Sequence, residues 1–432
     1  MFQKVVIIGN GIAGVTAARH IRKFSNKEIL IISAESEYFF SRTALMYIYM
    51  GHMKFEHTQP YENHFWKKNN IQLLQAFVEN VDVSNKKLTT QTGEEISYDQ
   101  LILATGSQTA FRGWEGENLN GVQGLVNKQD LELLEKNTKH IHKAVIIGGG
   151  LIGVELAEML HTRNIDVTML IRESGFWGNV LPKQDAQFIS RHIEKHGIEI
   201  LKETELDKII EDKNNQVTSI LTKEGKQIKC DFVGICTGVQ PKIKFLKNSG
   251  IETNRGILVN KYLETNIKDV YAIGDCAELR EPSSQRRSIE AVWYVGRMMG
   301  ETLAQSICDN PTAYQPGNWF NSAKFFDIEY QTYGSVLAYA EDDIGDFYWE
   351  DPKHEKAIHI QFAKADETFL GINTFEIRMR HEVIDQFLSR QIKVSEVISR
   401  LKTANFDKEF SRKYENQIQT SFNETYSNSK VT

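Results

Sequence analysis

Short apolar runs followed by glycine-rich turns and helical patterns occur twice in this chain. Residues 5–8 are apolar, a glycine-rich turn follows, and apolar residues then recur at helical spacing. The same order begins again at Lys143, with an apolar run over 144–147. The helical positions are Val15, Ala17, Ala18 and Ile21 in the first copy, and Val154, Leu156, Ala157 and Leu160 in the second. A buried strand, a turn and an amphipathic helix begin a βαβ unit, so the pattern predicts two α/β units.

The two turns share one glycine spacing, which favours binding of a dinucleotide. The residues are Gly9, Gly11, Ile12, Ala13 and Gly14 in the first copy, and Gly148, Gly150, Leu151, Ile152 and Gly153 in the second. The first glycine permits the tight turn, the second lets backbone approach a pyrophosphate, and the third lets helix and strand pack closely. The diphosphate then lies at the helix N-terminus, where free N–H groups and the helix dipole favour an anion.

Acidic and basic residues after the second strand of each unit bear on the nucleotide bound. Glu35 follows the strand expected at 28–32 and is placed to accept the ribose hydroxyls of an adenosine, although a solvated acidic loop is the alternative. In the second unit Arg172 and Glu173 stand at this place. Arg172 favours the 2′-phosphate of NADPH, whereas Glu173 favours a ribose hydroxyl of NADH, and we lean toward NADPH.

Composition excludes several classes of protein. The chain has 432 residues, 51 Lys and Arg against 57 Asp and Glu, 41% hydrophobic residues and a net charge of −6, as in ordinary globular proteins. Nucleic-acid binding is not expected, and no apolar run is long enough to span a membrane. The four cysteines lack the spacing of a redox dithiol or zinc knuckle, and we predict no metal site. The start of the chain lacks the apolar stretch of a secretion signal, so we expect a cytoplasmic protein.

Three further segments, 101–106, 234–241 and 265–275, complete a resemblance to a known family. Together with the two glycine turns, their order resembles the two-dinucleotide-binding-domain flavoproteins of the pyridine nucleotide-disulfide oxidoreductase superfamily. In that family the first unit binds FAD, the second binds NAD(P)H, and the last segment returns to the flavin. The resemblance assigns to Asp275 the ribityl chain of FAD. It also assigns cofactor contacts to Ala104, Thr105, Gly106, Gly238 and Gly274.

The resemblance implies an α/β fold with two Rossmann-like FAD- and NAD(P)-binding domains, the second inserted in the first, and an α+β C-terminal interface domain. The FAD domain is expected over 1–120 and 245–318, and the NAD(P)H domain over 121–244. Alternating aromatic residues after 318 and a helical pattern up to residue 401 place the interface domain at 319–403. Such domains often mediate dimerisation, so a homodimer is an expectation. We interpret 404–432 as a polar helical or disordered tail.

One residue decides the branch of this superfamily. Disulfide reductases carry a redox cysteine after the second strand, but here Arg42 occupies that place and no cysteine is near. This resembles rubredoxin and ferredoxin reductases and the flavin domain of nitrite reductase. We therefore predict that Arg42 lies beside the flavin and stabilises the anionic reduced ring. The resemblance also places Glu155 at the nicotinamide carboxamide and Trp293 against the flavin.

These features predict an FAD-dependent NAD(P)H oxidoreductase. A hydride passes from NAD(P)H to FAD, and electrons leave without a thiol intermediate to a small carrier similar to ferredoxin or rubredoxin. A quinone or dioxygen is an alternative acceptor. A different class remains open, a redox-sensing flavoprotein similar to apoptosis-inducing factor, in which reduction switches dimerisation.

Overall fold

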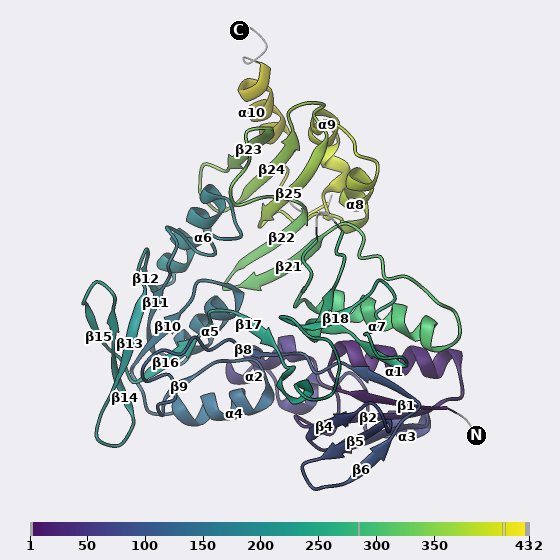
Figure 1. Ribbon diagram of the computed structural model, residues 1–432. Coiled ribbons are helices and arrows are strands. Elements are labelled where there is room, and N and C mark those ends of the chain that lie inside the picture. Colours follow the sequence, from purple (N-terminus) through teal and green to yellow (C-terminus); the bar gives the residue numbers. More distant parts are fainter. Residues whose placement is uncertain (1–2, 284–285, 408, 411, 428–432) are drawn as a thin grey trace.

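Two parallel sheets and one antiparallel sheet organise the chain (Figure 1). The computed structural model describes residues 3–283, 286–407, 409–410 and 412–427. No helix among these residues is long and apolar enough to cross a membrane. The predicted α/β architecture with two Rossmann-like units and an α+β C-terminal domain is confirmed.

The first sheet is built from segments far apart in the sequence. Its order is β19 (Val270–Ala272), β7 (Gln100–Leu103), β1 (Lys4–Ile8), β2 (Glu28–Ser33) and β3 (Ile71–Gln75), all parallel. Helices α1 (Ile12–Phe24) and α7 (Trp293–Ile307) pack against each other beside it (Figure 1). A Cβ on Gly300 would lie 2.6 Å from the Ala13 carbonyl oxygen, so this glycine permits the close approach. Because β19 pairs with β7 in this sheet, the residues that follow β19, including Asp275, lie near the first glycine turn.

Small elements surround the first sheet. Antiparallel strands β4 (Val78–Asp82), β5 (Lys87–Thr90) and β6 (Glu95–Ser97) form one subsheet, and β18 (Ile257–Val259) pairs with β20 (Ala277–Leu279). The short helices are η1 (Arg42–Ala44), α2 (Leu45–Tyr49), η2 (Phe55–Thr58), α3 (His64–Lys68), η3 (Lys244–Leu246) and η4 (Gly274–Cys276).

The second unit repeats the plan of the first. Its parallel sheet has the order β12 (Glu199–Leu201), β11 (Asp166–Leu170), β10 (Lys143–Ile147), β16 (Phe232–Ile235) and β9 (Val122–Gln123). Its helices are α4 (Lys128–Asn137), α5 (Leu151–His161) and α6 (Lys183–Lys195), and its hairpins use β13 (Leu206–Glu211), β14 (Val217–Thr222) and β15 (Gln227–Lys229). Strands β8 (Ser107–Thr109) and β17 (Val239–Pro241) pair where the chain enters and leaves this unit. That pairing closes the insertion at its base.

The C-terminal region is an antiparallel sheet covered by helices. The strand order is β21 (Phe320–Phe325), β22 (Ile328–Gly334), β25 (Phe369–Phe375), β24 (Ala357–Ala363) and β23 (Ile344–Glu350). The helices are α8 (His381–Ser389), α9 (Val394–Ala404) and α10 (Glu415–Ser427). The apolar helical pattern up to Leu401 therefore forms two helices, with Gln391 at a positive φ of 49° in the turn between them. Helix α10 buries Ile418 and Phe422 against the same core.

A buried polar network joins the second unit to the C-terminal sheet. His359 of β24 bonds Asp185 of α6 at 2.6 Å and Asp346 of β23 at 2.8 Å. The side chains of His359 and Asp185 have no exposed surface. Burial alone lowers the pKa of His359, but the two carboxylates outweigh it and raise the pKa to about 9. A charged histidine between two carboxylates thus holds α6 against the sheet.

Replacing this histidine should destabilise the protein in a pH-dependent way. We expect His359→Ala to lower the free energy of unfolding by about 3–5 kcal/mol near neutral pH, because it leaves a buried carboxylate without its cation. The folded pKa lies above the ordinary value of 6.5, so the contribution is complete below about pH 6.5 and is lost as pH rises through about 9. Urea unfolding between about pH 6 and pH 10 measures the difference between wild type and variant. His354→Ala, at an exposed histidine, is the control; a difference that does not shrink with rising pH contradicts the assignment.

Candidate active site

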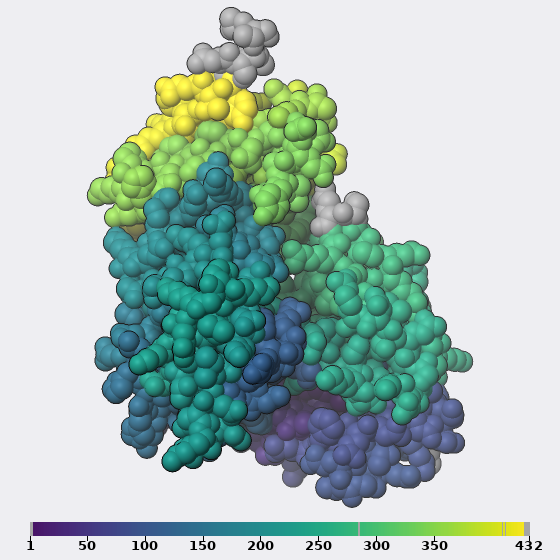
Figure 2. All heavy atoms as spheres, turned by 60° about the vertical axis from the view of Figure 1, so that its left-hand side comes forward, coloured from purple at the N-terminus to yellow at the C-terminus, as the bar shows by residue number. Residues whose placement is uncertain are grey.

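The first glycine turn opens into a cavity of about 590 Å³ that both units line. From the first unit come Gly9, Gly11, Ile12, Ala13, Glu35, Arg42, Ala104, Thr105, Gly106, Gly274, Asp275 and Trp293. From the second unit come Leu151, Ile152 and Glu155. The fold thus gathers most of the predicted cofactor residues at one site. Figure 2 shows a hollow between the blue and teal part of the chain, which is the second unit, and the green part that follows it in the sequence.

The geometry of the first turn fits a dinucleotide phosphate. Gly9 has φ +116°, and a Cβ there would lie 2.1 Å from the Ala104 carbonyl oxygen. A Cβ on Gly14 would lie 2.1 Å from the Gly9 carbonyl oxygen, so this position also requires glycine. Gly11, in contrast, faces open space and caps α1 without a side-chain hydrogen bond. The first N–H groups of α1 therefore remain available to an anion in the cavity.

Asp275 places a carboxylate deep in the same cavity. It lies in η4, directly after β19, and accepts a hydrogen bond of 2.8 Å from the Ser107 hydroxyl. Burial raises the pKa of Asp275, while Ser107 and the charge of Arg42 oppose this shift. A buried carboxylate with one hydroxyl partner retains acceptor capacity for ligand hydroxyls, which fits the ribityl chain of FAD. Ser107 was missed in the sequence because it carries no motif.

Glu35 and Arg42 form an ion pair that the sequence analysis did not anticipate. The guanidinium bonds both carboxylate oxygens, at 2.8 and 2.6 Å, and also the Val126 carbonyl oxygen at 2.7 Å. The backbone N–H of Lys128 donates to the same carboxylate at 2.8 Å. Glu35 therefore ties the first unit to the start of α4.

This ion pair bears on two sequence predictions at once. Glu35 was expected at the adenosine ribose and Arg42 beside the isoalloxazine, but these groups lie at opposite ends of FAD. A bidentate pair cannot occupy both ends, so the intact pair does not support the two assignments together. Of the two, the position of Glu35 at the end of β2 follows the general dinucleotide-binding geometry. The role of Arg42 beside the ring stays a prediction without support from these contacts.

The second glycine turn repeats the backbone geometry of the first. Gly148 has φ +115°, and a Cβ there would lie 2.4 Å from the Cys236 carbonyl oxygen. A Cβ on Gly153 would lie 2.4 Å from the Gly148 carbonyl oxygen. Gly150 caps α5 without a side-chain hydrogen bond, and its Cβ position lies 3.9 Å from the indole nitrogen of Trp177. Trp177 thus covers this turn, a contact that no sequence motif indicated.

The predicted nucleotide-selecting pair lies away from the two cavities. Arg172 is exposed and donates to Glu173 through Nε at 3.3 Å and Nη2 at 3.0 Å. Neither residue lines either cavity. The two predicted functions of this pair, binding a 2′-phosphate or a ribose hydroxyl, therefore compete through a direct contact.

Gly238, another predicted cofactor residue, lies before β17 at φ +104°, with open space around its Cβ position.

Glu155 connects the first cavity to a larger cleft. It lies on α5 and lines both spaces, and among the described residues its carboxylate has no hydrogen-bond or ion-pair partner. Burial, with a smaller contribution from Glu158, raises the pKa of Glu155 from 4.5 to about 7. A carboxyl group poised between its two protonation states at neutral pH is typical of functional sites.

The larger cleft, of about 1750 Å³, is rich in aromatic residues. It is lined by Trp177, Trp293, Tyr294, Trp319 and Tyr330, together with the β21–β22 hairpin. Trp293 begins α7 and lines both cavities, and its contact with a flavin stays a prediction. No cysteine among the described residues lines either space, and Cys276 is fully buried away from solvent.

Fold and site together define a two-dinucleotide-binding α/β protein, and sequence comparison gives its family. Residues 3–300 match the pyridine nucleotide-disulphide oxidoreductase family, and the chain belongs to it. It is 32% identical over 281 residues to a nitrite reductase (NAD(P)H) of Bacillus subtilis, covering 64% of this chain and 35% of that protein. It is 26% identical over 395 residues to the assimilatory nitrate reductase electron transfer subunit of the same organism, covering 90% and 50%. The chain thus spans half or less of these two relatives.

Other similar proteins are closer in length. The rubredoxin-NAD(+) reductase of Acinetobacter baylyi is 31% identical over 289 residues, covering 64% of this chain and 72% of that protein. Among solved structures, a NAD-dependent persulfide reductase from A. fulgidus matches with a TM-score of 0.87 and 21% identity, over 99% of this chain and 84% of that one. The covalent putidaredoxin reductase–putidaredoxin complex matches with a TM-score of 0.81 and 20% identity, over 91% and 94%. These structures support the fold.

Ionisation of Glu155 should destabilise the folded protein at pH values above 4.5, the ordinary pKa of a glutamate. We expect Glu155→Gln to raise the free energy of unfolding by about 1–3 kcal/mol near pH 8, because the folded state disfavours the ionised carboxylate. The folded pKa is raised from 4.5 to about 7, so the gain develops as pH rises through this window and vanishes below about pH 4.5. Urea unfolding at both ends of the window measures it. Glu224→Gln, at an exposed position, is the control; an equal gain at low pH contradicts the assignment.

The Arg172–Glu173 contact yields a paired test of nucleotide choice. If Arg172 binds a 2′-phosphate, Arg172→Ala should lower the ratio of kcat/KM for NADPH to that for NADH by about tenfold or more, as for loss of a charge-assisted hydrogen bond. Glu173→Gln should raise the same ratio, because it frees the guanidinium. Steady-state kinetics with both nucleotides measure the ratio. An unchanged ratio in both variants rejects this pair as the selecting residues.

Proposed function

We propose that this chain is an FAD-dependent NAD(P)H oxidoreductase that passes electrons to a small iron–sulfur or rubredoxin-like carrier without a thiol intermediate. One observation carries the proposal. Glu155 of the second unit reaches the cavity formed by the first glycine turn and Asp275, and no cysteine lies among the described residues lining it. Bound FAD would supply the hydride acceptor and the release of single electrons.

The residues of the first unit divide FAD binding among them. The N-terminus of α1 binds the pyrophosphate, Glu35 the adenosine ribose and Asp275 the ribityl hydroxyls. Arg42 acts as a positioning residue, since it holds both oxygens of Glu35 and bonds the Val126 carbonyl. Its positive charge also acts on Asp275, where it lowers the pKa of the carboxyl against the effect of burial.

The second unit brings the nicotinamide to the flavin. The N-terminus of α5 binds the pyrophosphate of NAD(P)H, and Glu155, a turn further along the helix, orients the carboxamide. An ionised Glu155 would accept a hydrogen bond from the carboxamide N–H₂ and would stabilise the positive charge of an oxidised nicotinamide ring. Trp293 closes the site from α7 and helps exclude water.

The proposed acceptor rests on the absent thiol and on the relatives. No cysteine is among the described residues that line the cavity, so the site offers no thiol for a mixed disulfide, and a bound flavin would pass its electrons to the acceptor directly. An assimilatory nitrate reductase electron transfer subunit matches 90% of this chain, and rubredoxin-NAD(+) reductases match 64% to 75% of it. Electron delivery to a redox protein is thus the function these names share.

Dioxygen is the second candidate acceptor. An NADH oxidase of Methanocaldococcus jannaschii is 29% identical over 344 residues, covering 76% of this chain and 75% of that protein. Oxygen therefore belongs among the acceptors to be compared. The redox-sensing flavoprotein remains a third alternative.

Rapid anaerobic mixing should identify the acceptor. Purified protein should be yellow and bleach on addition of NAD(P)H, and ferredoxin or rubredoxin should reoxidise it faster than about 1 s⁻¹, within the usual range of turnover. Faster reoxidation by oxygen or a menaquinone analogue favours the alternative reductases. A reduced flavin that persists with every acceptor favours the sensor.

Flavin content tests the site itself. Asp275→Asn should purify with less FAD than wild type, because the neutral amide is a weaker acceptor for ribityl hydroxyls than a carboxylate. Asp343→Asn, an identical change at an exposed position, should retain full flavin content. Absorbance at the flavin bands relative to protein measures both. Equal loss, or none, in the two variants contradicts the assigned role of Asp275.

A further inference from the structure

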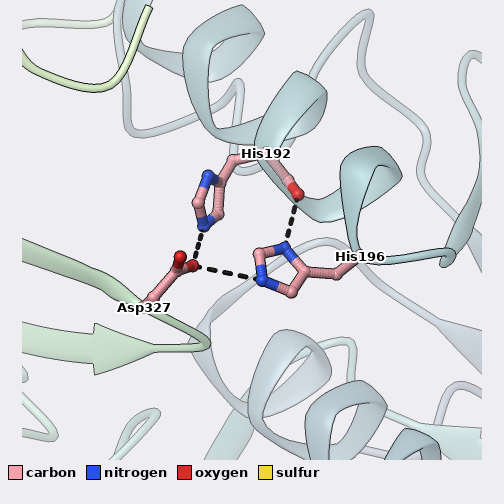
Figure 3. Close-up of side chains that lie close together, drawn as sticks. All are labelled: His192, His196 and Asp327. Atoms are coloured by element: carbon pink, nitrogen blue, oxygen red, sulfur yellow. Dashed lines mark hydrogen bonds and ion pairs between the residues drawn. The ribbon is translucent and has the colours of Figure 1, made fainter.

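Two histidines and an aspartate meet outside the active site, where α6 contacts the β21–β22 hairpin (Figure 3). His192 and His196 are four residues apart, so both rings leave the same face at the end of α6. Asp327 comes from the turn between β21 and β22. One ligand atom from each residue lies within 4.8 Å of the others.

The hydrogen bonds leave an acceptor facing an acceptor. His196 Nδ1 donates to the His192 carbonyl oxygen at 2.9 Å, so Nε2 carries the lone pair of the neutral ring. That Nε2 lies 3.2 Å from Asp327 Oδ1, and His192 Nε2 also contacts this oxygen. A carboxylate oxygen cannot donate, so an added proton on His196 Nε2 or a metal ion must lie between that nitrogen and Asp327, whereas a neutral His192 can donate to the carboxylate from its own Nε2.

The geometry allows one metal ion to take the place of that added proton. The two imidazole centroids are 4.6 Å apart, and the ligand atoms of both rings and of Asp327 converge, so one ion can contact all three. Lys195 is the nearby positive charge that acts against a cation here.

We propose that His192, His196 and Asp327 bind a divalent transition metal ion such as Zn²⁺. Two imidazoles and one carboxylate are a zinc ligand set, and the exposed side of Asp327, 70% accessible, leaves room for water at the fourth position. The His196 Nδ1–H bond to backbone fixes the tautomer that a ligand requires. The Phe326 N–H donates to Glu158 of α5 at 2.7 Å, which holds the turn carrying Asp327 in place.

The metal would clamp the second unit to one wall of the larger cleft. The β21–β22 hairpin supplies Asn321, Ser322, Lys324 and Tyr330 to that wall, and Asp327 lies at its turn. Binding would therefore join α6 to the hairpin, in addition to the Asp185–His359 contact that links α6 to β24 of the same sheet.

Equilibrium dialysis of the full chain against Zn²⁺ tests the proposal. Protein with its flavin bound is treated with a chelator, desalted and dialysed against Zn²⁺, and bound metal is measured by mass spectrometry. We expect one Zn²⁺ per chain and a raised Tm on binding. Each of His192→Gln, His196→Gln and Asp327→Asn should weaken binding by about 10- to 100-fold or more. Because Asp327 is exposed, its variant keeps the test valid if a histidine variant fails to fold.

His140→Gln, at an exposed histidine outside the cluster, is the matched control and should bind Zn²⁺ as wild type does. Two results overturn the proposal. One is the absence of stoichiometric Zn²⁺ in wild type, which leaves a protonated His–Asp pair. The other is binding that survives Asp327→Asn and both histidine replacements, or that falls equally in the control. Neither readout depends on turnover, so failure here is separate from failure of the proposed oxidoreductase activity.

Discussion

Two helix N-termini without side-chain caps are the constraint around which this chain is organised. Gly11 and Gly150 cap α1 and α5 without offering a side-chain acceptor, so the first N–H groups of both helices remain unpaired. Unpaired buried donors are costly, and an anionic ligand relieves that cost. The flanking glycines fix the turns so tightly that a Cβ would meet backbone oxygen. The rest of the fold positions these two helix N-termini relative to one another.

Polar contacts between units maintain this relative position. Glu35 and Arg42 of the first unit bond the segment leading into α4, and Asp185 of α6 bonds His359 of the C-terminal sheet. Such contacts are directional and lose much of their strength with small displacements. They therefore specify one arrangement of the units where apolar packing alone would tolerate several.

The site is also where the protein carries a local energetic cost. Glu155 has no polar partner among the described residues, and its burial raises the pKa of its carboxyl. Trp177 has a positive φ of 53° close to the second glycine turn. Both are unfavourable in isolation, and both residues line the larger cleft. Unfavourable groups concentrated at one cleft are typical of a site shaped by function.

The family resemblance implied the return of Asp275 to the first turn. The residues by themselves determined the repeated strand–turn–helix units and the glycine positions. These signals are local: the side-chain period sets the element, and a positive φ or a close approach requires glycine. Three contacts were decided by the tertiary structure alone. Arg42 pairs with Glu35, and Trp177 covers the second glycine turn. His192 and His196 meet Asp327, which is 135 residues from His192 in the sequence. No local period records such contacts, because they depend on how separate units pack and which rotamers that packing permits.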